Sequence, residues 1–271
     1  MSVANVSLQE ELEIIGKQAR AASNALRPLS RAVKDKALLL IAAKLRERRA
    51  HFQAENEKDL ATGREKGLSE AMIDRLTLKD KVVEGMAAGL ETVAALPDPV
   101  GDIVEQTIHP TGIRIAKVRQ PLGVVGIIYE SRPNVTADAA ALCLKSGNAC
   151  VLRGGSEAFY SNVAIAEIIK EGIREAGAPE HAVQIISTTD RAAVGAMLKL
   201  DRYIDVIVPR GGKGLIARIL DESRIPVVAH LDGVCHTYIH EDADPEMARP
   251  FCCHQASSRS AKGGGAGCGG V

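Results

Sequence analysis

Short apolar strands that alternate with helical segments are the feature of this sequence that most restricts its fold. The runs VVGIIY (124–129) and ACVLR (149–153) are typical of buried strands, and residues 137–145 between them have helical spacing. The alternation continues with an amphipathic helix at 162–177 and further strands at 182–187, 204–209 and 225–230. The sequence therefore predicts an α/β fold with a doubly wound parallel sheet that helices cover on both faces.

A helical region precedes this sheet. From Leu8 to about Leu96 apolar residues recur at helical spacing, with Lys and Arg on the other faces. Pro97, Pro99 and Gly101 end that pattern, and GIRIAKVRQP (112–121) then alternates apolar with basic residues as a half-exposed strand does. We expect a helical opening over 1–96 and an arm or ribbon over about 100–120.

Composition excludes several classes of protein. Lys plus Arg and Asp plus Glu both total 34, and no basic stripe interleaved with aromatic residues is present, which argues against a nucleic-acid partner. The apolar runs are far shorter than the ~20 residues of a membrane helix, and the first residues lack the pattern of a signal peptide. The six cysteines show no metal-ligand or disulfide spacing. We expect a soluble, cytoplasmic protein without a metal site.

The first polar turn that follows a strand is YESRPNVT, residues 129–136. Open α/β sheets bind ligands beyond the carboxyl ends of their strands, so such turns are candidate binding sites. Pro133 fixes the backbone, and Asn134 could direct an amide donor toward a ligand. Asn134 could equally cap the next helix, and the local sequence does not separate these roles.

Two further turns carry glycines. In LRGGSEA (152–158) the glycines allow the backbone to approach a ligand, and the serine and glutamate offer groups for a ribose or a phosphate. VPRGGKGLI (208–216) opens a helix whose N-terminus favours anions, but its spacing matches neither common phosphate-binding motif. A plain turn explains either segment. The candidate cofactor-binding residues are Arg153, Gly154, Gly155, Ser156, Glu157, Pro209, Gly211, Gly212, Lys213 and Gly214.

Other residues with reactive side chains are weaker candidates. His230 and Asp232 follow a strand and could handle protons, and Cys235 could be activated, but structural roles explain all three. Cys143 and Cys150 lie in apolar stretches, where cysteine acts as a small hydrophobic residue. From residue 249 the sequence RPFCCHQASSRSAKGGGAGCGGV has no helical or strand period, and a disordered tail is expected.

Four segments, taken in order, resemble the gamma-glutamyl phosphate reductases, also called glutamate-5-semialdehyde dehydrogenases, which are relatives of the aldehyde dehydrogenases. These are KVRQPLGVVGIIYESRPNVT, LCLKSGNACVLRGGSEA, DVIVPRGGKGLI and HLDGVCHTYI. The resemblance extends over nearly all of the chain up to Met247. It implies an aldehyde dehydrogenase-like fold with a cofactor domain, a catalytic domain and an arm used in homo-oligomers.

The resemblance also implies an activity. The family reduces L-glutamate 5-phosphate, an acyl phosphate, to the semialdehyde with NADPH during proline biosynthesis. By similarity, Asn134 would polarise the substrate carbonyl, residues 153–157 would contact the adenosine side of NADP(H), and residues 209–214 would lie near its phosphates. His230 falls where many aldehyde dehydrogenases have a general-base glutamate. The reductases have histidine at this position, so the base role does not carry over to His230.

The chemistry requires a thiolate that attacks the acyl phosphate and a thioacyl enzyme that accepts hydride. In the family a segment like RPGVCNAAETLL supplies this cysteine after EDADPEMA (241–248). Here Cys252, Cys253 and Cys268 stand in a different sequence, as a change of reading frame near codon 249 would produce. We therefore expect an NADP-binding domain at 1–229, the start of a catalytic domain that is mostly missing at 230–248, and an aberrant tail at 249–271.

Three interpretations remain at this stage. The chain is an active NADPH-dependent reductase, a non-catalytic cofactor-binding fragment, or a remnant that aggregates because an apolar face is uncovered. NADPH oxidation that depends on substrate would indicate the first, and binding without turnover would indicate the second.

Overall fold

The computed structural model of the chain describes residues 7–130, 132–229 and 238–249. Contacts divide the chain into two units, residues 1–231 and 232–271. In the described part of the second unit, the imidazole of His240 lies 3.2 Å from a carboxylate oxygen of Asp242. The fold described below is that of the first unit. Whether the two units correspond to the predicted cofactor and catalytic domains stays a prediction.

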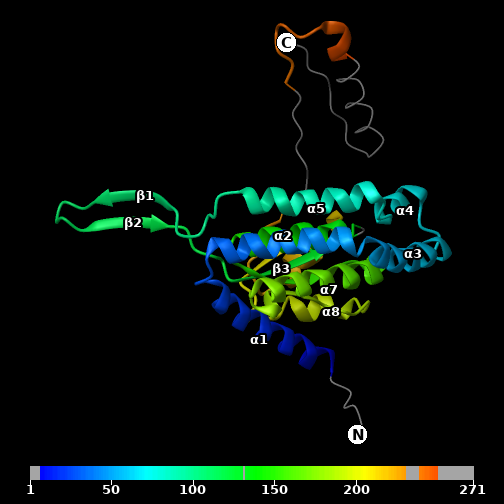
Figure 1. Ribbon diagram of the computed structural model, residues 1–271, viewed down its shortest axis with the longest axis horizontal. Coiled ribbons are helices and arrows are strands. Elements are labelled where there is room, and N and C mark those ends of the chain that lie inside the picture. The colour runs from blue at the N-terminus through cyan, green and yellow to red at the C-terminus, as the bar shows by residue number, and fades with distance from the viewer. Residues whose placement is uncertain (1–6, 131, 230–237, 250–271) are drawn as a thin grey trace. The chain divides into compact units, whose positions relative to one another are not determined.

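The predicted helical opening is helical, and its described residues, 7–96, form α1 (Leu8–Leu26), α2 (Arg31–Glu47), α3 (Arg49–Glu65), α4 (Glu70–Leu76) and α5 (Asp80–Ala95). Ser7 begins α1 with a capping box, in which Ser7 and Glu10 satisfy each other's backbone amides. Helix α2 packs against α5 and also against α7 of the sheet region (Figure 1). No helix in the described ranges is both long and apolar enough to cross a membrane.

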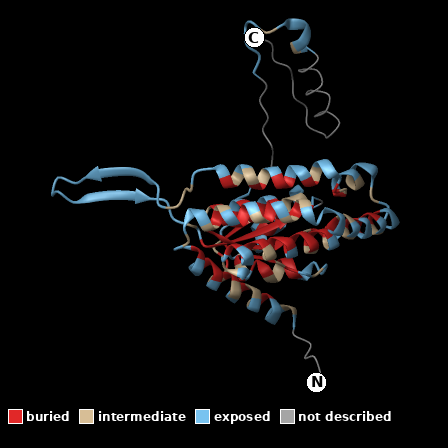
Figure 2. Ribbon diagram, viewed as in Figure 1, coloured by how far each residue is buried: buried red, intermediate tan, exposed pale blue. Residues whose placement is uncertain are grey.

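The central sheet is parallel and has the strand order β5-β4-β3-β6. Its strands are β3 (Val124–Tyr129), β4 (Ala149–Arg153), β5 (Val183–Ile185) and β6 (Val206–Arg210). Every residue of β3 and β4 is buried, as expected for strands covered on both faces (Figure 2). The predicted α/β fold with a doubly wound parallel sheet is thus confirmed.

Four helices connect or follow these strands: α6 (Asn134–Lys145), α7 (Phe159–Ala176), α8 (Ala192–Met197) and α9 (Lys213–Glu222). Helices α6 and α7 contact each other and α2, whereas α1 contacts β3, β4, β5 and α8. Helical layers therefore cover the two faces of the sheet. Gly177, with φ 80°, closes α7 in the left-handed conformation.

The arm over 100–120 is a two-stranded antiparallel hairpin of β1 (Ile103–Ile108) and β2 (Arg114–Val118). The prediction that the strand within 112–121 is half-exposed is wrong, because every residue of both strands is exposed (Figure 2). No other described element covers either face of the hairpin, so its apolar residues stay in contact with solvent in this chain.

The strand predicted at 225–230 does not form over its described residues, 225–229. Val227 makes a single parallel bridge to Ile207 of β6. Pro226 accepts a hydrogen bond from the amide of Ile207 but has no amide hydrogen to donate, so the pairing is not extended there.

Candidate functional site

The strand order places a topological switch point between β3 and β6. From β3 the chain moves through β4 to β5 on one side, and it then crosses to β6 on the other side of β3. Loops that leave neighbouring strands in opposite directions open a crevice at the carboxyl edge of the sheet. The residues that follow β3, β4 and β6 therefore meet at this edge.

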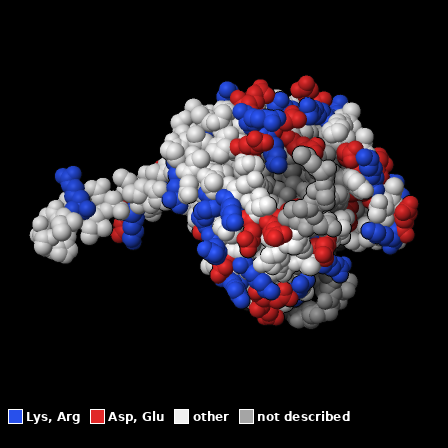
Figure 3. Space-filling view, turned by 90° about the horizontal axis from the view of Figure 1, so that it is seen from below, with Lys and Arg blue, Asp and Glu red and all other residues white. Residues whose placement is uncertain are grey.

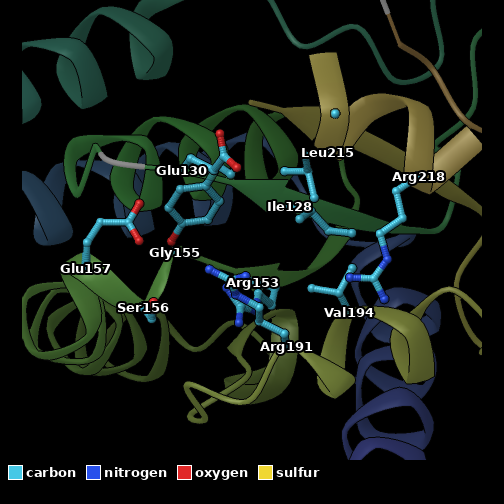
Figure 4. Close-up of a pocket in the computed structure, with 12 residues that line it drawn as sticks. Ile128, Glu130, Arg153, Gly155, Ser156, Glu157, Arg191, Val194, Leu215 and Arg218 are labelled. Carbon is cyan, nitrogen blue, oxygen red and sulfur yellow. The ribbon is translucent and has the colours of Figure 1, made fainter. Parts of the chain in front are cut away.

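A cavity of about 330 Å³ occupies this position (Figure 4). We call it the carboxyl-edge cavity. It receives side chains from the ends of β3 and β4, from the loops that follow them, and from α8 and α9. Its lining residues are Ile128, Tyr129, Glu130, Arg153, Gly155, Ser156, Glu157, Arg191, Val194, Gly214, Leu215 and Arg218.

The structure brings part of the predicted cofactor set to this cavity. Arg153, Gly155, Ser156, Glu157 and Gly214 line it. Binding by any of the ten stays a prediction. Those that do not line the cavity are Gly154, Pro209, Gly211, Gly212 and Lys213.

Arg153 is the most constrained charged group of the cavity. It is 6% exposed, and its Nη atoms donate to the carbonyl oxygens of Gly154, at 2.6 Å, and Asp190, at 3.3 Å. Its Nε is buried without a hydrogen-bond partner. Burial lowers the pKa of the Arg153 guanidinium, although a guanidinium stays charged in proteins. Arg153 therefore joins the loops after β4 and β5 and leaves one buried donor without a partner.

Two further guanidinium groups and two carboxylates complete the charged lining. Figure 4 shows Arg191 beside Arg153, with Arg218 entering from α9 and Glu157 on the opposite side. Arg218 pairs with Glu222 one turn along α9, at 2.8 Å, and this bond raises the pKa of Arg218. With Arg218 paired to Glu222, Arg153 and Arg191 are the guanidinium groups that suit a ligand carrying negative charge.

Buried polar contacts that join the end of β3 to α6 and α7 support the cavity. The hydroxyl of Tyr129 lies 2.7 Å from that of Thr136, and Thr136 donates to Asn162 at 3.0 Å. Burial raises the pKa of Tyr129, so this phenol stays protonated and serves as a structural donor. A Cβ at Gly154 would lie 2.1 Å from the amide nitrogen of Asn162, which gives that glycine a packing role.

Asn134 is placed differently from the cofactor candidates. It is the first residue of α6, it follows Pro133, and its amide donates to Asp138 of the same helix at 3.2 Å. It does not line the carboxyl-edge cavity. Its proposed contact with a substrate carbonyl would require this bond to open, and the role stays a prediction.

The predicted reactive residues near the C-terminus lie outside the described residues. These are His230, Asp232, Cys235, Cys252, Cys253 and Cys268. Within the described ranges, Cys143 and Cys150 are buried free thiols, as their apolar surroundings predict. A hydrogen bond with Cys143, together with burial, raises the pKa of Cys150. The described residues include no cluster of three His, Cys, Asp or Glu that could hold a metal ion.

Sequence reasoning missed several cavity residues. Glu130 belongs to the YESRPNVT turn, but we considered only its proline and its asparagine. Arg191 lies in the loop after β5, and this loop contains no glycine that would mark it as a ligand-binding turn. Arg218 is four residues beyond Gly214, so helical spacing from the predicted loop could have identified it.

Comparisons with known proteins agree with this geometry. A profile described as "Aldehyde dehydrogenase family" matches residues 2–261. The structure is similar to that of gamma-glutamyl phosphate reductase from Thermotoga maritima, with 42% identity, a TM-score of 0.85, and coverage of 92% of this chain and 60% of that one. Gamma-glutamyl phosphate reductase from Saccharomyces cerevisiae has 35% identity and a TM-score of 0.76, with coverage of 91% of this chain and 63% of that one. The resemblance found in the sequence is confirmed.

A more distant structure shares the fold alone. An acetylating aldehyde dehydrogenase from Geobacillus thermoglucosidasius has 21% identity and a TM-score of 0.60 over 81% of this chain. The chain spans less than two thirds of the length of the two reductases that it matches.

Proposed function

The chain belongs to the aldehyde dehydrogenase family, and from that premise we propose that its carboxyl-edge cavity binds NADP(H) in a gamma-glutamyl phosphate reductase. The proposed reaction is reduction of L-glutamate 5-phosphate to L-glutamate 5-semialdehyde and phosphate, in proline biosynthesis. The observation that carries the proposal is a cavity at the switch point of a parallel sheet, lined by a buried arginine with an unused donor.

The lining residues fit a dinucleotide. The buried Nε of Arg153 lacks a partner, and Arg191 adds positive charge to the same space. The backbone at Gly211 and Gly212 opens α9 without a side chain, so a phosphate could approach the helix N-terminus closely. When bound, the nicotinamide supplies the hydride, and the chain's own residues hold and orient it.

The charge of the lining favours NADP(H) over NAD(H). A phosphate on the adenosine ribose adds negative charge, which guanidinium groups bind well. Arg153 and Arg191 offer such groups next to the hydroxyl of Ser156. Glu157 opposes this preference, because a carboxylate suits an unmodified ribose hydroxyl. The charge of Arg153 is buried and therefore less screened than an exposed charge. An anionic phosphate should for this reason interact with Arg153 more strongly than the ribose hydroxyl interacts with Glu157.

The arm supports a proposal about assembly. Apolar side chains of the hairpin are exposed, among them Ile108 at 67% and Ile113 at 62%. Figure 3 shows few charges along the arm, whereas acidic and basic residues mix over the rest of the visible face. Burial of such residues against another copy would remove apolar surface from water. We propose a cytoplasmic homo-oligomer in which the arm contributes to the contact, with no nucleic-acid partner.

A second candidate is a cofactor-binding chain without turnover. Neither described cysteine lines the cavity, and both are buried, so no described thiol is placed to attack an acyl phosphate. The nucleophile would have to come from residues outside the described ranges. Binding and turnover therefore need separate measurements.

The test uses the 271-residue chain and a variant of its most constrained arginine. NADPH binding is followed by fluorescence, and turnover is followed with glutamate 5-semialdehyde, NADP and phosphate. Arg153→Met should weaken NADPH binding at least about tenfold, because charge-assisted hydrogen bonds are lost. The control Arg64→Met removes an exposed arginine of α3, distant in sequence from the cavity loops, and should leave binding unchanged. Absence of NADPH binding in the unchanged chain would refute the proposal, and binding without turnover would support the second candidate.

A further inference from the structure

We propose that the carboxylate of Glu130 occupies the anion position at the N-terminus of α9, so that the phosphates of an incoming dinucleotide must displace it. This inference rests on the proposed function, because it treats the carboxyl-edge cavity as the cofactor site. It adds an internal competitor to that site, which would set how tightly phosphate-bearing ligands bind.

The first observation is the contact itself. The backbone amide of Gly212, the N-cap residue of α9, donates to Oε2 of Glu130 at 3.0 Å. The amide of Glu130 donates to the carbonyl oxygen of Arg210 at 3.2 Å, which fixes the start of this side chain beside β6. The first amides of a helix lack partners within the helix and carry a partial positive charge. The carboxylate of Glu130 thus satisfies the kind of group that would otherwise bind a phosphate.

The second observation is the space at Gly211. A Cβ on this residue would lie 2.6 Å from Oε2 of Glu130 and 2.8 Å from its Cδ. The φ of Gly211 is not in the left-handed region, so its backbone conformation alone does not require glycine. The missing side chain instead leaves room for an anionic group against the backbone, and Glu130 fills that room.

The third observation points to a ligand independently of the helix. Arg153 lines the same cavity, is 6% exposed, and has a buried Nε without a partner. In Figure 4 the carboxylate of Glu130 is turned away from Arg153. The cavity therefore contains a buried cation with an unused donor and, separately, a carboxylate on the helix N-terminus. An arriving anion reaches the amide of Gly212 only after Glu130 leaves.

This arrangement has a measurable consequence. A phosphate and the carboxylate cannot accept the same amide hydrogen, and their like charges repel each other at short distance. Removal of the Glu130 carboxylate should therefore tighten binding of phosphate-bearing ligands about tenfold, within the range of charge effects at helix N-termini. A ligand without phosphate, such as adenosine, should not respond.

The experiment compares the full chain with Glu130→Ala and Glu130→Gln. NADPH binding is measured by fluorescence, and binding of inorganic pyrophosphate and adenosine by calorimetry. Glu167→Ala is the matched control, because Glu167 is an exposed carboxylate on α7. We expect NADPH and pyrophosphate to bind about tenfold tighter to Glu130→Ala, with adenosine and the control unchanged.

The outcomes separate this inference from the proposed function. If NADPH binds to none of the proteins, the proposed function fails, and pyrophosphate binding alone decides whether Glu130 blocks the helix N-terminus. Equal binding of NADPH and pyrophosphate to Glu130→Ala would overturn the inference, and weaker binding would overturn it and would make Glu130 a ligand-binding residue. Thermal unfolding midpoints verify folding. Should Glu130→Ala be unfolded, Glu130→Gln, which keeps the side-chain length, decides the result in the same way.

Discussion

Replacement of Asp59 by alanine should destabilise the fold at the point where the helical opening supports the site. Asp59 belongs to α3 and is 3% exposed. Its carboxylate accepts hydrogen bonds from the amide of Tyr160 at 3.1 Å, the amide of Ser161 at 2.8 Å and the hydroxyl of Ser161 at 2.6 Å. The N-cap residue of α7 is Ala158, which has no side-chain acceptor. Asp59 therefore caps α7 from another helix, directly after the loop that carries Ser156.

The magnitude follows from the bonds that disappear. Loss of a helix cap costs about 1 kcal/mol, and each hydrogen bond to a charged group contributes about 1.5–3 kcal/mol. Removal of the carboxylate also removes the cost of its burial, which offsets part of this loss. We expect the free energy of unfolding at pH 7 to fall by about 3 kcal/mol in Asp59→Ala. In Asp59→Asn it should fall by about 1–2 kcal/mol, because the amide oxygen still accepts a bond.

Urea unfolding followed by circular dichroism measures both changes. Glu57→Ala is the control, since Glu57 is an exposed carboxylate on the same helix and its loss should change stability by at most about 0.5 kcal/mol. If Asp59→Ala were as stable as this control, the assignment of Asp59 as the cap of α7 would be wrong.

The same residue predicts a dependence on pH. Burial raises the pKa of Asp59 above its ordinary value of 3.8, although bonds from Ser161 and Tyr160 oppose the shift. The folded state then holds the proton more tightly than the unfolded state. The stability contributed by this group is complete below pH 3.8 and is lost as the pH rises through the folded pKa. The stability difference between the unchanged chain and Asp59→Asn should therefore shrink as pH rises from 3.8, and an increase would contradict the direction of the shift.

Three further changes should alter stability in the same urea assay. Lys145→Met removes a buried ammonium group that pairs with Asp35 and should cost about 3 kcal/mol, whereas a loss below about 1 kcal/mol would show that Arg31, which also donates to Asp35, satisfies that carboxylate alone. Gly126→Ala places a Cβ 2.5 Å from the side chain of Ile207 and should cost about 1–3 kcal/mol. An unchanged free energy of unfolding would show that the core repacks around the added methyl group. Tyr129→Phe removes one buried hydrogen bond and should cost about 1 kcal/mol, and no loss at all would mean that the bond adds nothing to stability.

Local pattern determined the elements and their order. The strands at 124–129 and 149–153 have the bounds that the apolar runs predict, because a strand buried on both faces has to be apolar along its length. The helical opening and the fold class followed in the same way. The single bridge at Val227 shows where pattern fails, since Pro226 limits pairing within an apolar run that otherwise resembles a strand.

The composition of the site depended on the tertiary structure. Sequence indicated three turns, but only the strand order brings the loops after β3, β4 and β6 to one cavity. Glu130 meets Gly212 across 82 residues of sequence, and Asp59 meets Ser161 across 102. Hydrophobic periodicity records which face of an element is buried, and it carries no information on which distant element supplies the partner. The sequence by itself therefore determined the fold and the family resemblance, whereas folding in three dimensions decided which charges share the cavity.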